Sequence, residues 1–159
     1  MLRHSLLRAA LAALLCLSAV SSASAMPPRK HHHVRRHDVG IHPAGERALT
    51  YARHMLGVPY SYGGASRAGV DCSGLTMLAW RSAGVSLPHS SYAQWSLGRH
   101  VSRRHLEPGD VVFFSGLGHV GLYAGRGRFI HAPHTGTQVR VDRLWGSGYG
   151  ARYMGAVRP

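Results

Sequence analysis

Acidic residues and lysine are both scarce in this chain. Its 159 residues include six Asp and Glu against 19 Lys and Arg, and Lys30 is the sole lysine, so the formal charge is +13 at pH 7. Such a charge attracts polyanions. The chain has no zinc-finger spacing, recognition helix or aromatic-rich binding strand, which argues against nucleic acid as a partner. The charge favours anionic envelope polymers or phospholipid headgroups, or it serves solubility alone.

No apolar run reaches the ~20 residues that a helix needs to cross a bilayer. The run Ala9–Val20 follows the basic residues Arg3 and Arg8 and precedes Ala23-Ser24-Ala25. A basic start, an apolar stretch and small residues at a cleavage site are typical of a secretory signal. We therefore predict a signal peptide over residues 1–25, no transmembrane segment after its cleavage, and export to the periplasm, the cell wall or the exterior.

Cysteine is almost absent. Cys16 lies in the predicted signal, so Cys72 is the one thiol that the exported chain keeps, and it has no partner for an internal disulfide. A lone thiol in an oxidising compartment is either a small buried apolar side chain or a group that is used chemically.

Apolar residues are also rare over residues 26–43, where proline, arginine and the run His31–His33 dominate. Such a segment buries too little surface to offset its ordering entropy, so we predict a flexible, basic, His-rich arm. Its histidines suit weak metal binding, but no ligand geometry is visible, and we predict neither a metal site nor a cofactor. One domain is expected over residues 44–159.

The rest of the chain has helical patterns first and strand patterns afterwards. Apolar residues recur at helical spacing between Ala48 and Leu56 and again from Cys72 to Ala83, and Ser90–Leu97 is expected to form a short helix. This order of elements predicts an α+β fold, with N-terminal helices packed on an antiparallel β-sheet. The strand-like runs are residues 111–115, 119–124, 128–132, 137–141 and 151–157.

Cys72 begins the second predicted helix, directly after a glycine-rich loop. The partial positive charge and free N–H groups of a helix N-terminus are expected to lower the pKa of the thiol and to form an oxyanion hole. A thiolate nucleophile also needs a general base close by.

Two histidines on neighbouring predicted strands are candidates for that base and its support. If the turn between the strands centres on Gly125, His119 and His131 lie directly opposite each other on one face. Gly121, on the same face, is expected to leave room for a substrate, and His131 to fix the tautomer of His119 by a hydrogen bond. The alternation sends to the opposite, core face Val120, Leu122 and Ile130.

Four runs of residues carry a resemblance to a known family. They are Asp71-Cys72-Ser73-Gly74 preceded by Pro59–Gly64, then Leu106–Phe114, Gly118–Tyr123 and Phe129–Pro133. In this order, from Ala44 to Val157, they resemble the NlpC family of bacterial cell-wall cysteine peptidases. The cysteine precedes both histidines, which distinguishes the chain from circularly permuted relatives.

The resemblance implies a papain-like α+β fold and hydrolysis of peptidoglycan stem peptides, usually at the bond between γ-linked D-glutamate and meso-diaminopimelate. It implies a triad of Cys72 as nucleophile, His119 as base and His131 as orienting residue. Tyr60 matches the tyrosine beside the family's cysteine and is expected near the oxyanion. Asp71 and Ser73 are expected to contact the free amine of a stem peptide, although Asp71 serves equally well as a helix cap. The family often has arginine where this chain has His89.

Two other readings stay open at this point. The same fold can act as an amidase, deamidase or acyltransferase on another exported substrate, because related sites perform several acyl transfers. A non-enzymatic protein that binds the envelope or sequesters metal through the basic arm would instead need residues 26–43 and not Cys72.

Overall fold

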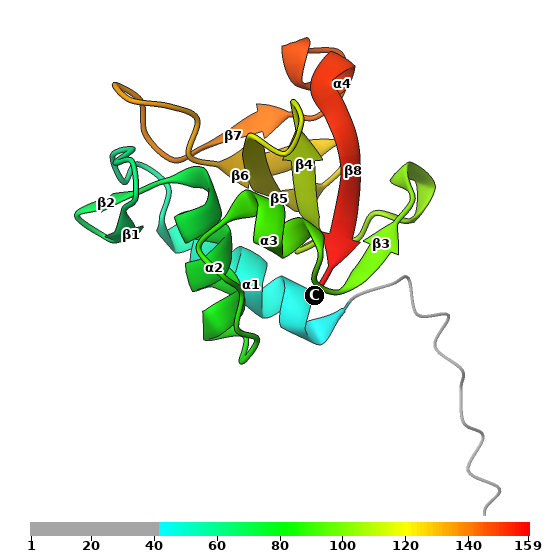
Figure 1. Ribbon diagram of the computed structural model, residues 1–159, viewed down its shortest axis with the longest axis horizontal. Helices are drawn as coiled ribbons and strands as arrows, with labels where there is room; N and C mark the ends of the chain where they lie inside the picture. Colours follow the sequence, from blue (N-terminus) through cyan, green and yellow to red (C-terminus); the bar gives the residue numbers. More distant parts are fainter. Residues whose placement is uncertain (1–41) are drawn as a thin grey trace, which may run out of the picture. The chain divides into compact units, whose positions relative to one another are not determined.

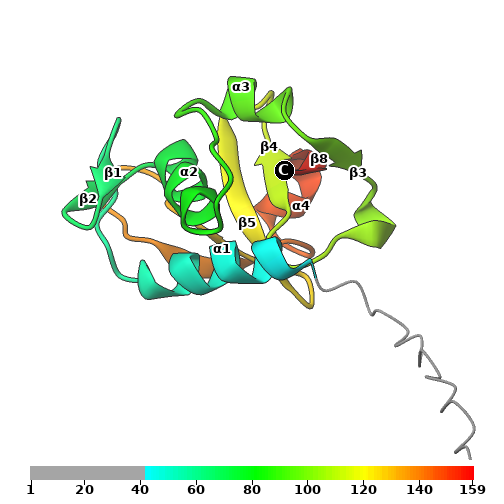
Figure 2. The same cartoon turned by 90° about the horizontal axis from the view of Figure 1, so that it is seen from below.

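Helices α1 (Pro43–His54) and α2 (Cys72–Ser82) lie across one face of a six-stranded antiparallel sheet in the computed structural model, which describes residues 42–159 (Figures 1 and 2). The predicted α+β fold with N-terminal helices on an antiparallel sheet is confirmed. The sheet order is β3-β8-β4-β5-β6-β7. Its strands are β3 (Arg99–Val101), β4 (Val111–Phe114), β5 (His119–Gly125), β6 (Arg128–His131), β7 (Arg140–Arg143) and β8 (Tyr153–Arg158).

The remaining elements are short. A two-stranded hairpin, β1 (Ala65–Ser66) and β2 (Gly69–Val70), lies within the predicted glycine-rich loop. Helix α3 (Ser91–Trp95) falls inside the predicted third helix, η1 (Arg103–His105) is a turn of 3₁₀-helix, and α4 (Gly148–Arg152) leads into β8.

Helix α1 begins at Pro43, one residue before the expected start of the domain, and ends at His54, short of the expected end at Leu56. Pro43, the last residue of the predicted arm, fits the first turn because the N–H that proline lacks has no partner there. The helix stops before Gly57, whose φ of 84° is a left-handed conformation that glycine adopts without strain. One face of α1 is fully buried, through Ala48, Leu49 and Ala52.

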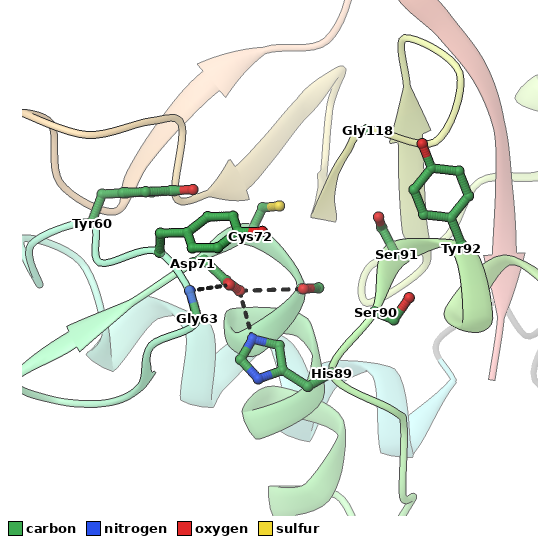
Figure 3. A pocket seen from close by; sticks show the side chains of 11 residues that line it. Tyr60, Gly63, Asp71, Cys72, His89, Ser90, Ser91, Tyr92 and Gly118 are labelled. Atoms are coloured by element: carbon green, nitrogen blue, oxygen red, sulfur yellow. Dashed lines mark hydrogen bonds and ion pairs between the residues drawn. The ribbon is translucent and has the colours of Figure 1, made fainter.

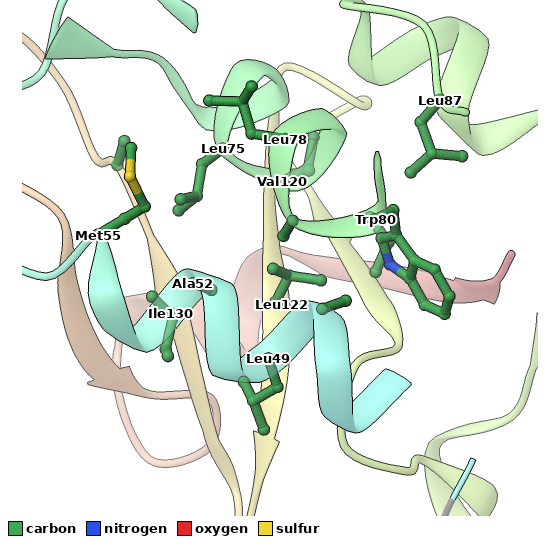
Figure 4. Close-up of a cluster of buried hydrophobic side chains, with 14 of the residues drawn as sticks. Leu49, Ala52, Met55, Leu75, Leu78, Trp80, Leu87, Val120, Leu122 and Ile130 are labelled. Atoms are coloured by element: carbon green, nitrogen blue, oxygen red, sulfur yellow. The ribbon is translucent and has the colours of Figure 1, made fainter. Parts of the chain in front are cut away.

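The main core fills the space between these helices and the sheet (Figure 4). Alternation along β5 and β6 directs Val120, Leu122 and Ile130 into it, as predicted, and each is 0–1% exposed. The indole of Trp80 in α2 is also buried, and its Nε1 donates to the carbonyl of Gly109 at 3.2 Å. This contact fastens α2 to the turn that precedes β4.

A second, smaller cluster covers the opposite face of the sheet. It contains Val112 and Phe114 of β4, Phe129 of β6 and Leu144 after β7, with Tyr149 of α4 packed against it. Two aromatic members of this cluster, Phe114 and Phe129, lie next to His119 and His131, so the second cluster packs directly against the candidate site.

Three strand assignments from the sequence need correction. The fourth expected strand, residues 137–141, is β7 at residues 140–143. The last begins at Tyr153 and not at Ala151, because Gly148–Arg152 is helical, with Ser147 as its cap. Strand β3 was not expected, since its three residues form a short, largely exposed edge without a clear apolar alternation.

None of the helices within residues 42–159 combines the length and apolarity required to cross a bilayer. The predicted signal peptide and nearly all of the predicted arm lie outside the described residues, and both stay predictions.

Candidate active site

Cys72 is the first residue of α2, and the carboxylate of Asp71 caps the helix (Figure 3). Oδ1 of Asp71 accepts hydrogen bonds from the N–H of Gly74 at 2.7 Å and from the hydroxyl of Ser73 at 3.2 Å. Oδ2 accepts from the N–H of Gly63 at 2.9 Å. Asp71 thus joins the glycine-rich loop to the helix start and fixes the backbone on both sides of the thiol. Contact of Asp71 or Ser73 with a substrate amine stays a prediction.

The glycine of the Asp-Cys-Ser-Gly run is required by close packing. A Cβ at residue 74 would collide with the carbonyl oxygen of Gly64, and it would lie 3.0 Å from Nε2 of His89. The first turn of α2 therefore lies directly on the glycine-rich loop. His89 itself pairs with Oδ1 of Asp71 at 2.8 Å, so the residue that stands where the family often has arginine contacts the capping carboxylate.

The thiol is partly exposed and lines a hollow of about 380 Å³. Burial raises the pKa of Cys72, and backbone hydrogen bonds from Val120, Ser73 and Cys72 itself offset only part of this rise. The expected lowering of the thiol pKa by the helix N-terminus is therefore wrong as a net effect, because desolvation of the thiolate outweighs the N–H groups. The contact with Val120 also places the sulfur against β5, beside His119.

Tyr60 lines the same hollow, and its ring extends toward Cys72 (Figure 3). Burial, and then the charges of Cys72 and Asp71, raise the pKa of the Tyr60 hydroxyl above 10.0. The hydroxyl therefore keeps its proton at neutral pH, and it is a hydrogen-bond donor in the hollow that contains the thiol.

His119 and His131 share a face of the sheet, but they are not directly opposite. The observed pairs are Leu122–Ile130 and Tyr123–Phe129, which place His131 opposite Gly121 and shift the expected register by two residues. The turn consists of Arg126 and Gly127, both with positive φ, and the register shifts again between Tyr123 and Gly125. A shift of two residues preserves the face, so the two imidazoles are diagonal neighbours.

Gly121 does not leave room for a substrate as expected. A Cβ at this position would come within 2.7 Å of the Phe129 ring and 3.0 Å of Cβ of His131. The space above Gly121 is filled by these two side chains, which stack with ring centroids 4.3 Å apart. Glycine at this position is what allows the imidazole of His131 to lie across β5 and reach His119.

A chain of hydrogen bonds runs from His119 to the edge of the sheet. Nε2 of His119 lies 2.8 Å from Nδ1 of His131, and Nε2 of His131 lies 3.0 Å from Oδ2 of Asp142. Arg140 Nε donates to the same oxygen at 3.0 Å. His131 is 0% exposed, so both of its ring nitrogens are satisfied away from water. Asp142 and Arg140 were not predicted, and Asp142 lies just outside the expected strand over residues 137–141.

These contacts fix the tautomer of both imidazoles. Hydrogen bonds from His131 and Arg140 hold the pKa of Asp142 below its ordinary value, although burial opposes them, so the carboxylate is ionised and only accepts. Nε2 of His131 must then carry a proton, and its Nδ1 accepts from Nε2–H of His119. The lone pair of His119 therefore resides on Nδ1, the nitrogen not engaged by His131.

Burial also keeps the two imidazoles neutral. It lowers the pKa of His119 to about 3, helped by the nearby His131, Arg152 and His134, and the pKa of His131 to about 4 in spite of Asp142. Since the pKa of the Cys72 thiol is raised, the resting pair is a neutral thiol and a neutral imidazole. Among residues 42–159, no group of three or more His, Cys, Asp or Glu side chains is arranged to hold a metal ion.

Acid is expected to destabilise the fold through these imidazoles. In the unfolded chain their pKa is near 6.5, so between pH 6.5 and about 4 the unfolded state binds protons that the folded state does not. The stabilisation is complete above pH 6.5, and between pH 7 and 5 the free energy of unfolding should fall by about 2 kcal/mol for each imidazole. Urea unfolding between pH 7 and 5 measures how steeply the free energy of unfolding falls with pH. His131→Phe should make this dependence weaker, whereas His54→Gln, on the exposed end of α1, should not. Equal pH dependence in the wild type and both variants would contradict the assignment.

A family model described as the NlpC/P60 family matches residues 57–158, which hold the thiol, both histidines and Asp142. The chain belongs to the NlpC/P60 family. The family predicted from the four sequence runs and its papain-like α+β fold are thereby confirmed, whereas peptidase activity and the role of each site residue stay predictions.

Similar proteins support the same family. The probable endopeptidase Rv2190c of Mycobacterium tuberculosis is 46% identical over 101 residues, which cover 62% of this chain and 26% of that protein. The gamma-D-glutamyl-L-lysine dipeptidyl-peptidase of Bacillus cereus is 37% identical over 122 residues, 73% of this chain and 37% of that protein. The structure of the peptidoglycan hydrolase RipB from Mycobacterium tuberculosis superimposes with a TM-score of 0.64 at 32% identity, over 73% of this chain and 64% of that one. This NlpC/P60 chain spans about a quarter of the length of the curated mycobacterial relative.

Proposed function

We propose that this NlpC/P60 chain is an exported cysteine endopeptidase that hydrolyses peptidoglycan stem peptides at the D-γ-glutamyl–meso-diaminopimelate bond. The observation that carries the proposal is the hydrogen-bonded series His119–His131–Asp142, because it leaves a basic lone pair on Nδ1 of His119, on the strand against which the Cys72 sulfur lies. Two relatives, a peptidoglycan hydrolase and a gamma-D-glutamyl-L-lysine dipeptidyl-peptidase, support a γ-D-glutamyl bond of peptidoglycan, while the choice of meso-diaminopimelate over lysine rests on the family resemblance.

The first step is acyl transfer to the thiol. Nδ1 of His119 takes the proton of Cys72 as the sulfur attacks the amide carbonyl, since neither group is charged beforehand. The backbone N–H groups of Cys72 and Ser73 face the sulfur, and together with the protonated hydroxyl of Tyr60 they are suited to bind the oxyanion.

The second half of the reaction releases both products. His119, now protonated on Nδ1, gives that proton to the departing amine as the C–N bond breaks and a thioester remains on Cys72. The carboxylate of Asp142 stabilises the transient imidazolium through His131. A water molecule then gives a proton to His119 and attacks the thioester carbonyl. The C–S bond breaks, the acyl part leaves as a carboxylic acid, and His119 returns the proton to the sulfur.

A digest of a defined stem peptide tests the proposal. L-Ala-γ-D-Glu-meso-diaminopimelyl-D-Ala should yield two dipeptides, L-Ala-γ-D-Glu and meso-diaminopimelyl-D-Ala, which mass spectrometry resolves. Protein alkylated with iodoacetamide is the control and should yield neither. An intact γ-glutamyl bond would refute the endopeptidase. An N-acetylmuramoyl tetrapeptide with an amidated D-glutamate is the second substrate, from which release of ammonia would indicate a deamidase and release of the stem from muramic acid an amidase.

We propose that the basic arm, residues 26–43, retains the exported enzyme on anionic wall polymers, since the chain is strongly positive. The same digest on intact sacculi, with and without residues 26–41, separates the two roles; His42 and Pro43 are kept because they begin α1. Removal of the arm should reduce the protein bound to sacculi but leave cleavage of the soluble peptide intact; loss of peptide cleavage would contradict this division.

A further inference from the structure

A second hollow, of about 460 Å³, opens on the other side of His119. Its walls come from the β4–β5 loop, the start of β5, the loop after β6 and helix α4, and its polar side chains include His119, His134, Tyr149 and Arg152. Gly118 borders both this hollow and the one that contains Cys72. The two hollows therefore share Gly118, the residue before His119; Cys72 lines the first hollow and His119 the second.

The lining of this second hollow is cationic. Arg152 is exposed, and none of the five carboxylate side chains in residues 42–159 forms an ion pair with it. Asp142, on the neighbouring strand, is already engaged by His131 and Arg140. After burial and His131, it is Arg152 and His134 that lower the pKa of His119, which places the guanidinium and the second imidazole close to the base.

Arg152 is also held in place. Its Nε donates to the carbonyl of Gly148 at 3.0 Å, and its guanidinium lies over the Tyr149 ring, 4.8 Å from the centroid. The carbonyl of Arg152 accepts from the N–H of Ser115 at 3.0 Å, which ties α4 to the β4–β5 loop. The terminal nitrogens of the guanidinium have no acceptor within residues 42–159 and are free to bind a carboxylate in two-point geometry.

The proposed function determines which part of the substrate reaches this hollow. His119 protonates the departing amine, so the residue that carries this amine must lie on the imidazole side, and the acyl part on the thiol side. In meso-diaminopimelate the side chain of that residue ends in an amine and a carboxylate, whereas lysine has the same side chain without the carboxylate.

We infer that this hollow is a leaving-group subsite in which Arg152 binds the side-chain carboxylate of diaminopimelate and so favours it over lysine. The inference rests on the proposed function. It assigns selectivity to a charge on the departing side of the scissile bond, in a different hollow from the one lined by Asp71, Cys72 and His89.

Three peptides of the form L-Ala-γ-D-Glu-X-amide test the subsite. X is meso-diaminopimelate, the same residue with its side-chain carboxylate converted to a carboxamide, or L-lysine. Because the C-terminal carboxylate of every peptide is an amide, the first peptide is the sole one whose departing residue carries a carboxylate. We expect its kcat/KM to exceed that of the other two by roughly 10-fold, the value of one charge-assisted hydrogen-bonding contact.

Two variants separate the subsite from an indirect effect on the base. Arg152→Gln should bring the ratio of kcat/KM between the carboxylate and carboxamide peptides close to one, and Arg152→Lys should retain part of it. Because the peptides share one base, a changed pKa of His119 cancels in this ratio. Thermal melting checks that both variants fold.

The outcomes are distinct for the two proposals. Cleavage of all three peptides by the wild type with equal kcat/KM, or a ratio that Arg152→Gln and Arg152→Lys both leave unchanged, would overturn the subsite and leave the endopeptidase standing. Cleavage of none at the γ-glutamyl bond would overturn the proposed function, and the subsite with it.

Discussion

Cys72→Ala should lower kcat for stem-peptide hydrolysis by roughly 10⁴-fold or more. Without the sulfur no thioester can form, and the N–H groups at the start of α2 have no tetrahedral intermediate to stabilise. What remains is the small rate that bound, oriented water attains with His119. Product formation over hours by mass spectrometry, set against initial rates of the wild type, measures a ratio of this size.

The substitution is expected to spare the fold and the binding of substrate. Cys72 is partly exposed at the first position of a helix whose cap, Asp71, is unchanged. Thermal melting should therefore stay within a few degrees of the wild type, and the stem peptide should still raise the melting temperature. Ser82→Ala, at the exposed end of the same helix, is the matched control and should retain its rate. Undiminished hydrolysis by Cys72→Ala would refute the mechanism.

The local parts of the site could be predicted from sequence because each depends on residues close in the chain. A capping residue, a thiol and a glycine within four positions define the start of α2, and Gly74 is explained by its contact with the loop that precedes the helix. Apolar spacing identified α1 and α2, and alternation placed the face of β5 and β6 correctly although the register was wrong.

The register was wrong because of conformations that residue types do not favour. Arg126 takes a φ of 51°, which is uncommon outside glycine, and an extra residue is accommodated before the turn between Tyr123 and Gly125. Neither is visible in a pattern of apolar and polar residues. The prediction that His119 and His131 share a face was nevertheless correct. Side chains alternate between the two faces of a strand, so a register shift of two residues keeps both imidazoles on the same face.

The unpredicted parts of the site depend on long-range pairing and on burial. Asp142 reaches His131 because β7 pairs with β6 in a register that places it opposite Phe129, after a connection of eight residues between the strands. Arg152 reaches His119 through a short helix with no apolar periodicity. The direction of the Cys72 pKa depends on how far the thiol is desolvated, and only the packing of α2 against β5 determines this.

His131→Phe is expected to lower kcat by roughly 10³-fold while KM changes by about twofold or less. The phenyl ring keeps the stacking on Phe129 but cannot accept from Nε2–H of His119. His119 is then free to carry its proton on Nδ1, the nitrogen that must receive the proton of Cys72. Since His131 acts through His119 and does not contact the reacting atoms, it is a positioning residue, and a loss confined to KM would contradict this role.

Asp142→Asn tests the outer end of the same series. The amide cannot stabilise an imidazolium through charge, so kcat should fall by about 10- to 100-fold. In the His131→Phe background, however, the same substitution should cost little more, because Asp142 influences His119 only through His131. Losses that multiply in the double variant would show that Asp142 acts on the reaction independently.

Arg140→Gln, which removes one donor to Asp142 and leaves the carboxylate charged, is the matched control and should have the smallest effect. The ranking of these four variants thus distinguishes a series that transmits its effect residue by residue from a cluster of polar side chains that merely stabilises the edge of the sheet.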